Sequence, residues 1–90
     1  MMRAVITVLG KDMVGILAKV STKCAEANVN VLEVTQSVLQ DLFAMIMMVD
    51  ISAMEEEFSD FAQELKAAGE GWGLSIHVMH EDIFHSMHRI

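Results

Sequence analysis

The sequence predicts one α+β domain of the ferredoxin-like class, with the element order βαββαβ. Two helical patterns each follow a strand-like segment, and the two strand-like segments between them are joined by the short connection Gln40-Asp41. Two βαβ halves joined by a hairpin give a four-stranded antiparallel sheet with both helices on one face. Right-handed crossovers place the first and third strands in the centre. The length of 90 residues is enough for one such domain.

The first strand and the first helix are read from residue type and spacing. Residues 3–9 are rich in β-branched side chains and predict a buried strand. Apolar residues then recur every three or four positions, which predicts an amphipathic helix; they are Val14, Leu17, Val20, Cys24 and Ala27. We expect Asp12 to cap the start of this helix and Asn28 to end it.

The second and third strands differ in their patterns. Residues 31–39 alternate, with Leu32, Val34 and Val38 on one side and polar residues on the other. Residues 42–51 are apolar on both faces, which is typical of a strand in the middle of a sheet.

Ser52 and Glu55 have the spacing of a capping box and predict the start of the second helix. Its expected apolar stripe consists of Met54, Phe58, Phe61, Leu65 and Ala68. We expect residues 69–73, which contain three glycines, to form the exit from this helix. The alternating residues Leu74, Ile76 and Val78 then predict the last strand.

The C-terminal segment extends beyond this minimal domain. After Asp82, a capping residue, a second helical stripe follows; its members are Ile83, Phe84, Met87 and Ile90. A free apolar stripe is unfavourable in water, so we expect it to be buried against the body or across a dimer. The sequence is therefore divided into a domain of residues 1–82 and a helical tail of residues 83–90.

Composition and charge restrict the possible partners. The chain is 53% hydrophobic and has nine methionines, an apolar excess that favours a partner surface and, most simply, a homodimer. Its formal net charge is −7, which disfavours binding to nucleic acids or to anionic membranes. The longest apolar run, residues 42–49, is far shorter than the ~20 residues that span a bilayer.

Cysteine usage and the first residues indicate a reducing compartment. Cys24 is the only cysteine, so the chain has neither an internal disulfide nor a CxxC motif, and we expect Cys24 in the core. The chain opens directly on a strand-like run without the pattern of a signal peptide. We expect a cytoplasmic protein.

Several activities of the ferredoxin-like fold are not supported by the residues. The loop after the first strand has no arginine to hold a phosphate, and Phe43 is the only aromatic residue in the first three strands, which disfavours RNA stacking. No Ser/His/Asp set, Cys/His pair or close carboxylate pair falls in one expected pocket, so we expect no enzyme and no cofactor. The histidines near the C-terminus (His77, His80, His85 and His88) are interpreted as solvated or interface residues, with metal binding as the alternative.

The loop from Gly10 to Gly15 is the most informative segment. A glycine at the entrance of a helix lets backbone amides approach a ligand, and amides at the positive end of a helix suit a carboxylate. The alternative is that both glycines only form a tight strand-to-helix turn.

Three segments in order resemble the ACT regulatory domain. They are LGKDMVGILAKVS (residues 9–21), residues 28–31 followed by a strand, and residues 45–51 followed by a helix. The resemblance covers about residues 3–80 and is similar to the ACT modules of the glycine cleavage system repressor and formyltetrahydrofolate deformylase. The whole chain, including HEDIFHSMHRI, resembles free-standing bacterial and archaeal ACT proteins of unassigned role. Met13-Val14 stands where the family commonly has Arg-Pro, so a ligand contact from that arginine is lost.

This resemblance implies a sensor of small molecules, often amino acids, that binds at a dimer interface and modulates a partner protein. It nominates as binding residues Gly10, Lys11, Asp12, Met13, Val14, Gly15, Asn28 and Asn30. Asp12 would take an α-amino group and the loop amides a carboxylate; alternatively Asp12 is a plain cap, and the two asparagines only supply turn geometry. The competing function is a ligand-free interaction module that acts through its sheet face or its tail.

Overall fold

The computed structural model describes residues 1–11 and 14–87. Its elements follow the order β1 (Arg3–Gly10), α1 (Ile16–Glu26), β2 (Asn30–Leu39), β3 (Leu42–Asp50), α2 (Phe58–Gly71), β4 (Ser75–His80) and α3 (Glu81–Met87). This order confirms the predicted α+β, ferredoxin-like fold with a short C-terminal helix. None of the described helices is long and apolar enough to cross a membrane.

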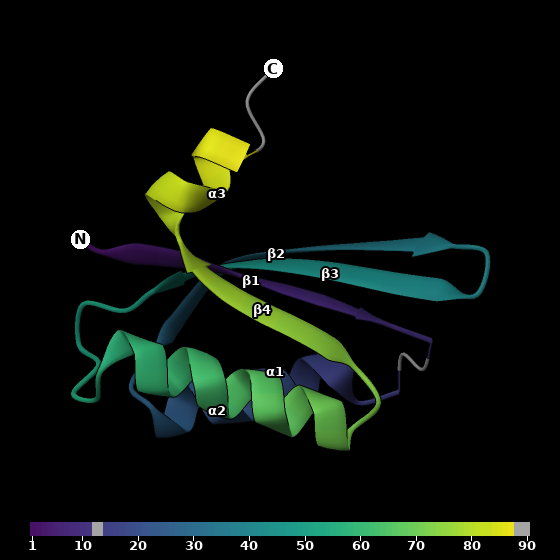
Figure 1. The fold of residues 1–90 in the computed structure, drawn as a ribbon, viewed down its shortest axis with the longest axis horizontal. Coiled ribbons are helices and arrows are strands. Elements are labelled where there is room, and N and C mark those ends of the chain that lie inside the picture. Colours follow the sequence, from purple (N-terminus) through teal and green to yellow (C-terminus); the bar gives the residue numbers. More distant parts are fainter. Residues whose placement is uncertain (12–13, 88–90) are drawn as a thin grey trace.

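The four strands form one antiparallel sheet in the order β2-β3-β1-β4. As predicted, β1 and β3 are central and the apolar segment after Gln40-Asp41 is an inner strand. Helices α1 and α2 lie side by side against one face, whereas α3 stands on the opposite side of the sheet (Figure 1). We call the face that carries α3 the open face.

The hydrophobic core lies between the sheet and the two long helices. Successive strand residues point to opposite faces, so every second residue of β1 and β3 enters the core. These residues are Ala4, Ile6, Val8, Phe43, Met45, Met47 and Val49. The helices supply Ile16, Val20, Cys24, Phe61 and Leu65. Cys24 is fully buried, as predicted, and burial raises its pKa to about 11.

Strand β2 departs from the predicted alternation. Its register against β3 shifts between Val31 and Glu33, so one extra residue is accommodated there as a bulge. Val31 and Val34 pack against the core, whereas Leu32 is 40% exposed. Val38 is also exposed, because the β2–β3 hairpin projects beyond the helices (Figure 1). The prediction that Leu32 lies on the same side as Val34 is therefore wrong, whereas Val38 does share the side of Val34, because both pair with core-facing residues of β3.

The predicted capping box at Ser52 is also wrong. Helix α2 begins at Phe58, and its N-cap residue Glu57 makes no side-chain capping hydrogen bond. The hydroxyl of Ser52 instead accepts a hydrogen bond from the backbone N–H of Met2 at 2.8 Å. The N–H of Ile51 donates to the carbonyl of Met2 at 2.9 Å. Ser52 therefore fastens the start of β1 to the segment that follows β3.

The exit from α2 lies later than predicted. The helix continues to Gly71, and Gly73 takes the left-handed conformation, with φ of 77°, before β4. Gly69 belongs to the buried stripe with Phe61 and Leu65 rather than to the exit. A Cβ at Gly69 would lie 2.6 Å from Cγ1 of Ile76, so a glycine is required for α2 to approach β4 this closely.

Helix α3 follows β4 without a break and begins at Glu81, so the predicted cap at Asp82 is wrong. The guanidinium of Arg3 donates two hydrogen bonds to the carboxylate of Glu81, one of them from Nε to Oε2 at 2.9 Å. Phe84 is half-buried, but Ile83 is 51% exposed, which contradicts its burial against the body of the same chain. Ile90 and the side chain of Met87 lie outside the described residues. Burial of the stripe across a dimer stays a prediction.

Candidate functional site

The loop between β1 and α1 is fixed at its first glycine by packing. Gly10 ends β1 opposite Phe43, and a Cβ at Gly10 would collide with Cδ2 of Leu74. Lys11 and Val14 are exposed, while Asp12 and Met13 lie outside the described residues. Gly10 therefore has a structural role whether or not a ligand binds.

Gly15 has a different role, because it sets the start of α1. It occupies the N-cap position in the left-handed conformation, with φ of 72° and ψ of 6°, where we expected Asp12. Its carbonyl accepts the first helical hydrogen bond from the N–H of Lys19 at 2.9 Å. In the described part of the chain, the N-cap makes no side-chain hydrogen bond and the first turn has no acidic residue. The positive end of α1 is thus suited to an anion.

The two predicted asparagines lie at the other end of α1. Asn28 follows the C-cap residue Ala27 with φ of 61°, and it ends the helix as predicted. Asn30 is the first residue of β2 and pairs with Asp50. The eleven residues of α1, at a rise of 1.5 Å each, span about 16 Å, and Gly15 and Asn28 lie beyond its opposite ends. One chain therefore does not bring these asparagines to the Gly10–Gly15 loop.

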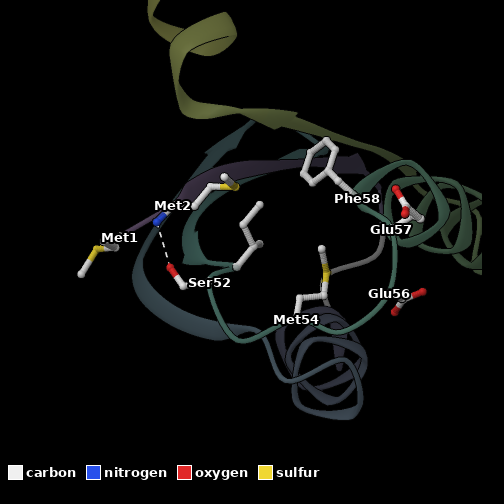
Figure 2. Close-up of a pocket in the computed structure, with 8 residues that line it drawn as sticks. Met1, Met2, Ser52, Met54, Glu56, Glu57 and Phe58 are labelled. Atoms are coloured by element: carbon white, nitrogen blue, oxygen red, sulfur yellow. Dashed lines mark hydrogen bonds between the residues drawn. The ribbon is translucent and has the colours of Figure 1, made fainter.

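A hollow of about 560 Å³ lies at the opposite end of β1 from this loop. Figure 2 shows the side chains of Met2, Met54 and Phe58 around its apolar interior, with the carboxylate of Glu56 directed away. The ring of Phe58 stacks on His80, with the ring centroids 4.1 Å apart. A hydrogen bond with Glu64 raises the pKa of Glu56.

This hollow was not predicted from the sequence. Its wall combines residues 1–2 with residues 51–58, which come together only because β1 and β3 pair antiparallel and Arg3 lies opposite Asp50. Two methionines flank the predicted inner strands, Met2 before the first and Met54 after the second, and they were the sequence feature that could have indicated this hollow.

The histidines form no metal site within the described residues, where no group of three metal-binding side chains is found. His85 lies 3.4 Å from the carboxylate of Glu81, and His80 stacks on Phe58. His77 lies 3.3 Å from the hydroxyl of Ser75, but both side chains are exposed on the open face. His88 lies outside the described residues.

A comparison of the sequence with protein-family models identifies the family of this βαββαβ domain. The ACT domain model matches residues 3–79. The chain belongs to the ACT domain family. Its ACT domain therefore covers β1 to β4, and α3 lies outside the matched segment.

Relatives of the same length as this ACT domain protein occur in bacteria and archaea. A UPF0237 protein of Listeria monocytogenes is 47% identical over 89 residues, which are 99% of this chain and 100% of that protein. A UPF0237 protein of Methanocaldococcus jannaschii is 48% identical over 90 residues, with all of both chains covered.

Solved structures confirm the fold. The ACT domain protein from Streptococcus pneumoniae has a TM-score of 0.81 and 37% identity, with 92% of this chain and 93% of that chain covered. A formyltetrahydrofolate deformylase from Pseudomonas syringae has a TM-score of 0.78 at 20% identity, with 89% of this chain and 28% of that chain covered. A putative glycine cleavage system transcriptional repressor has a TM-score of 0.70 at 20% identity, with 88% and 45% covered. At these lower identities the likeness concerns the fold alone.

Proposed function

We propose that this ACT domain protein is a homodimeric sensor that binds an amino acid or a similar small carboxylate and modulates a protein partner. ACT domains are often regulatory ligand-binding modules. We propose further that it acts in the cytoplasm and has neither catalytic activity nor a cofactor of its own.

The observation that carries this proposal is the conformation of Gly15. A left-handed glycine at the N-cap supplies no side chain of its own to the first amides of α1. A Cβ built at Gly15 meets no described atom within 4 Å, so the space beside this glycine is open among the described residues. A carboxylate placed there would accept hydrogen bonds from the backbone and interact favourably with the helix dipole.

The distance between the two groups of nominated residues supports a dimer. In one chain Gly15 precedes α1 and the two asparagines follow it, and the helix between them is about 16 Å long. If all of these residues contact one ligand, a second copy must supply one of the two groups. Exposed apolar side chains such as Leu39, which is 65% exposed, also favour association.

A thermal-shift screen of the individual amino acids and of small carboxylic acids tests the ligand. We expect one of them to raise the melting temperature, because a ligand at 100 times its dissociation constant adds about 2.7 kcal/mol of stability. A screen in which no compound shifts the transition would contradict the sensor.

Variants of Gly15 then test the site. Gly15→Val should abolish the ligand-induced shift, because its side chain fills the open space. Gly15→Asn adds a smaller side chain that tolerates the left-handed conformation, and it should weaken binding while the fold is retained. Gly71→Ala is the control: this glycine is distant in sequence, and its Cβ also meets no atom within 4 Å. If both Gly15 variants keep the full shift, the site lies elsewhere and the loop is structural.

The alternative function, a ligand-free interaction module, is favoured by the exposed apolar residues of the open face. Leu9, Leu42 and Ile46 are 39–44% exposed there. This function would be preferred if the ligand screen is negative and substitution of these residues abolishes association.

A further inference from the structure

The open face carries an apolar patch at the hairpin end of the sheet. Ala4, Ile6 and Val8 enter the core, so Leu9 points to the open face, and the register places Leu39, Leu42 and Ile46 on that face too. Their exposed fractions are 44%, 65%, 39% and 42%. We call these four residues the hairpin patch.

Helix α3 lies over the part of the open face formed by the start of β1 and the end of β4. It contacts β1 and β4, and the Arg3–Glu81 hydrogen bonds hold it against the start of β1. Val5, which faces away from the core cluster, is nevertheless 0% exposed. The open face therefore has a step. Helix α3 projects from one end of it (Figure 1), and the exposed hairpin patch lies at the other end.

Charge indicates what covers the patch. The chain has 13 acidic residues and a net charge of −7, so two copies repel each other over most of their surfaces. The open-face residues among and beside the patch carry no permanent charge; they are Thr7, Thr35, Ser37, Ala44 and Ser75, together with the titratable His77, which pairs with Thr7. Charged residues lie at the margin of the patch: Glu33, Lys11 directly after β1, and Asp41 in the turn. An uncharged apolar centre is where two acidic copies can meet, because interface cores are depleted of charge.

The two edges of the sheet, β2 and β4, are less suited to pairing with a second copy. Strand β4 is only six residues long, and the register of β2 breaks between Val31 and Glu33. Bulges of this kind interrupt the row of backbone hydrogen-bonding groups that edge-to-edge pairing requires. The hairpin patch offers exposed apolar side chains instead.

We propose that two copies of this chain pack their hairpin patches against each other about a two-fold axis, and that α3 of each copy abuts the hairpin tip of the other. The inference rests on the homodimer in the proposed function and specifies its geometry. Packed sheets lie about 10 Å apart, and a helix is about as thick, so α3 fits beside the overlap rather than within it.

The size of the patch explains why α3 takes part. Four strands about 4.8 Å apart and about five residues long span only about 15 by 17 Å. Stable dimers bury about 800 Å² on each partner, more than this footprint supplies alone. Contact between α3 and the hairpin tip adds the missing area and covers Ile83, which is 51% exposed in the single chain.

Sedimentation equilibrium with two matched variants tests the interface. Ile46→Glu places a charge in the patch, and Leu17→Glu places the same charge on α1 at nearly equal exposure, 42% against 40%. We expect Leu17→Glu to stay at twice the chain mass of 10.0 kDa. Ile46→Glu should raise the dissociation constant about 100-fold or more, because the two-fold axis brings two desolvated charges together. Circular dichroism checks that both variants fold.

Cysteine cross-linking tests the same geometry without adding charge. Cys24 is fully buried, so a cysteine introduced at the surface is the reactive thiol. A bismaleimide with a spacer of about 10 Å, the separation of packed sheets, should join two chains of Ile46→Cys but not of Leu17→Cys. A chain that ends at Asp82 should dimerise more weakly.

The outcomes separate this inference from the proposed function. A wild-type chain that remains monomeric at high micromolar concentration overturns both the homodimer and the interface. A stable dimer that tolerates Ile46→Glu and does not cross-link through residue 46 overturns the interface alone and leaves the homodimer standing. Loss of the dimer in Ile46→Glu, together with cross-linking through residue 46, supports the interface.

Discussion

Gly69 of α2 lies so close to Ile76 of β4 that a Cβ on Gly69 would be 2.6 Å from Cγ1 and 2.8 Å from Cδ1 of Ile76. Both residues are buried, and they join the second helix to an edge strand of the sheet. The helix contains a second glycine, Gly71, whose Cβ would meet no atom within 4 Å. The two glycines therefore respond oppositely to the same substitution.

We expect Gly69→Ala to lower the free energy of unfolding by about 1–3 kcal/mol, because the added methyl overpacks the core. Gly71→Ala should leave stability unchanged or raise it by about 0.5–1 kcal/mol through the loss of backbone freedom in the unfolded chain. Urea unfolding followed by circular dichroism measures both. The cost of Gly69→Ala should shrink in an Ile76→Ala background; an equal cost in both backgrounds would show that the contact is not the cause.

Gly15→Ala tests the conformation at the start of α1. The left-handed φ of 72° disfavours a Cβ by about 1–2 kcal/mol, although the surrounding space is open. We expect a loss of stability of that size and a smaller one for Gly15→Asn, since asparagine tolerates this conformation. Thermal unfolding of the two variants provides the measurement. Equal melting temperatures for Gly15→Ala and the wild type would contradict the left-handed conformation of residue 15.

The contact between Arg3 and Glu81 predicts a pH dependence of the attachment of α3. The hydrogen bond from Arg3 lowers the pKa of Glu81 below its ordinary value of 4.5, and His85 adds to this effect. Because the pKa of Glu81 is lower in the folded protein than in the unfolded chain, the contact with Arg3 contributes fully to stability at a pH above the unfolded pKa. This contribution is lost as the pH falls through the pKa that Glu81 has in the folded protein.

Glu81→Gln should therefore be less stable than the wild type at pH 7, and the difference should disappear on acidification below about pH 4.5. Urea midpoints recorded from pH 7 to pH 3 show this trend. Arg3→Gln should have little further effect in the Glu81→Gln background. A difference that stays constant across the whole range would rule out the ion pair as its source.

Because Cys24 is buried, we expect it to react slowly with thiol reagents. It is 0% exposed, and with its pKa raised to about 11 only about one thousandth of the thiol would be ionised at pH 8. We expect labelling by Ellman's reagent at the rate of unfolding, and rapid labelling of Ile46→Cys under the same conditions. Rapid reaction of the wild-type chain without denaturant would contradict the burial of this residue.

The architecture was predictable because it follows from local patterns. The β-branched run of β1, the three-and-four spacing of α1 and the doubly apolar β3 each fix an element independently of the rest of the chain. Right-handed crossovers then leave one arrangement of the four strands. Asn28, predicted to end α1, does so in the left-handed conformation that this residue tolerates.

The errors occur where a distant contact overrides a local signal. Ser52 has the spacing of a cap but binds the N–H of Met2, fifty residues away. Gly69 has the residue type of a helix exit but is buried against Ile76. The bulge in β2 adds a residue that no periodicity reveals, so Leu32 turns outward.

The candidate site was predictable only in part. Gly15 was found because a glycine before an apolar helix is visible in the sequence, and the structure places it at the N-cap of α1. The hollow at the other end of β1 was missed because residues 1–2 and 51–58 meet through strand pairing. The binding roles of the loop and of the two asparagines remain predictions.

The position of β1 also determines when the protein can fold during its synthesis. This first strand is paired on one side with β3 and on the other with β4, the last strand of the sheet. A growing chain that has reached only Asp50 can form the three strands β2-β3-β1 with α1 against them, but it still exposes the second edge of β1 and the part of the apolar face that α2 covers. The sheet is complete only after β4 has been synthesised, and non-local pairing of this kind is slow. Until then the exposed edge of β1 is open to pairing with other chains, and this is the stage at which the protein is most prone to aggregate.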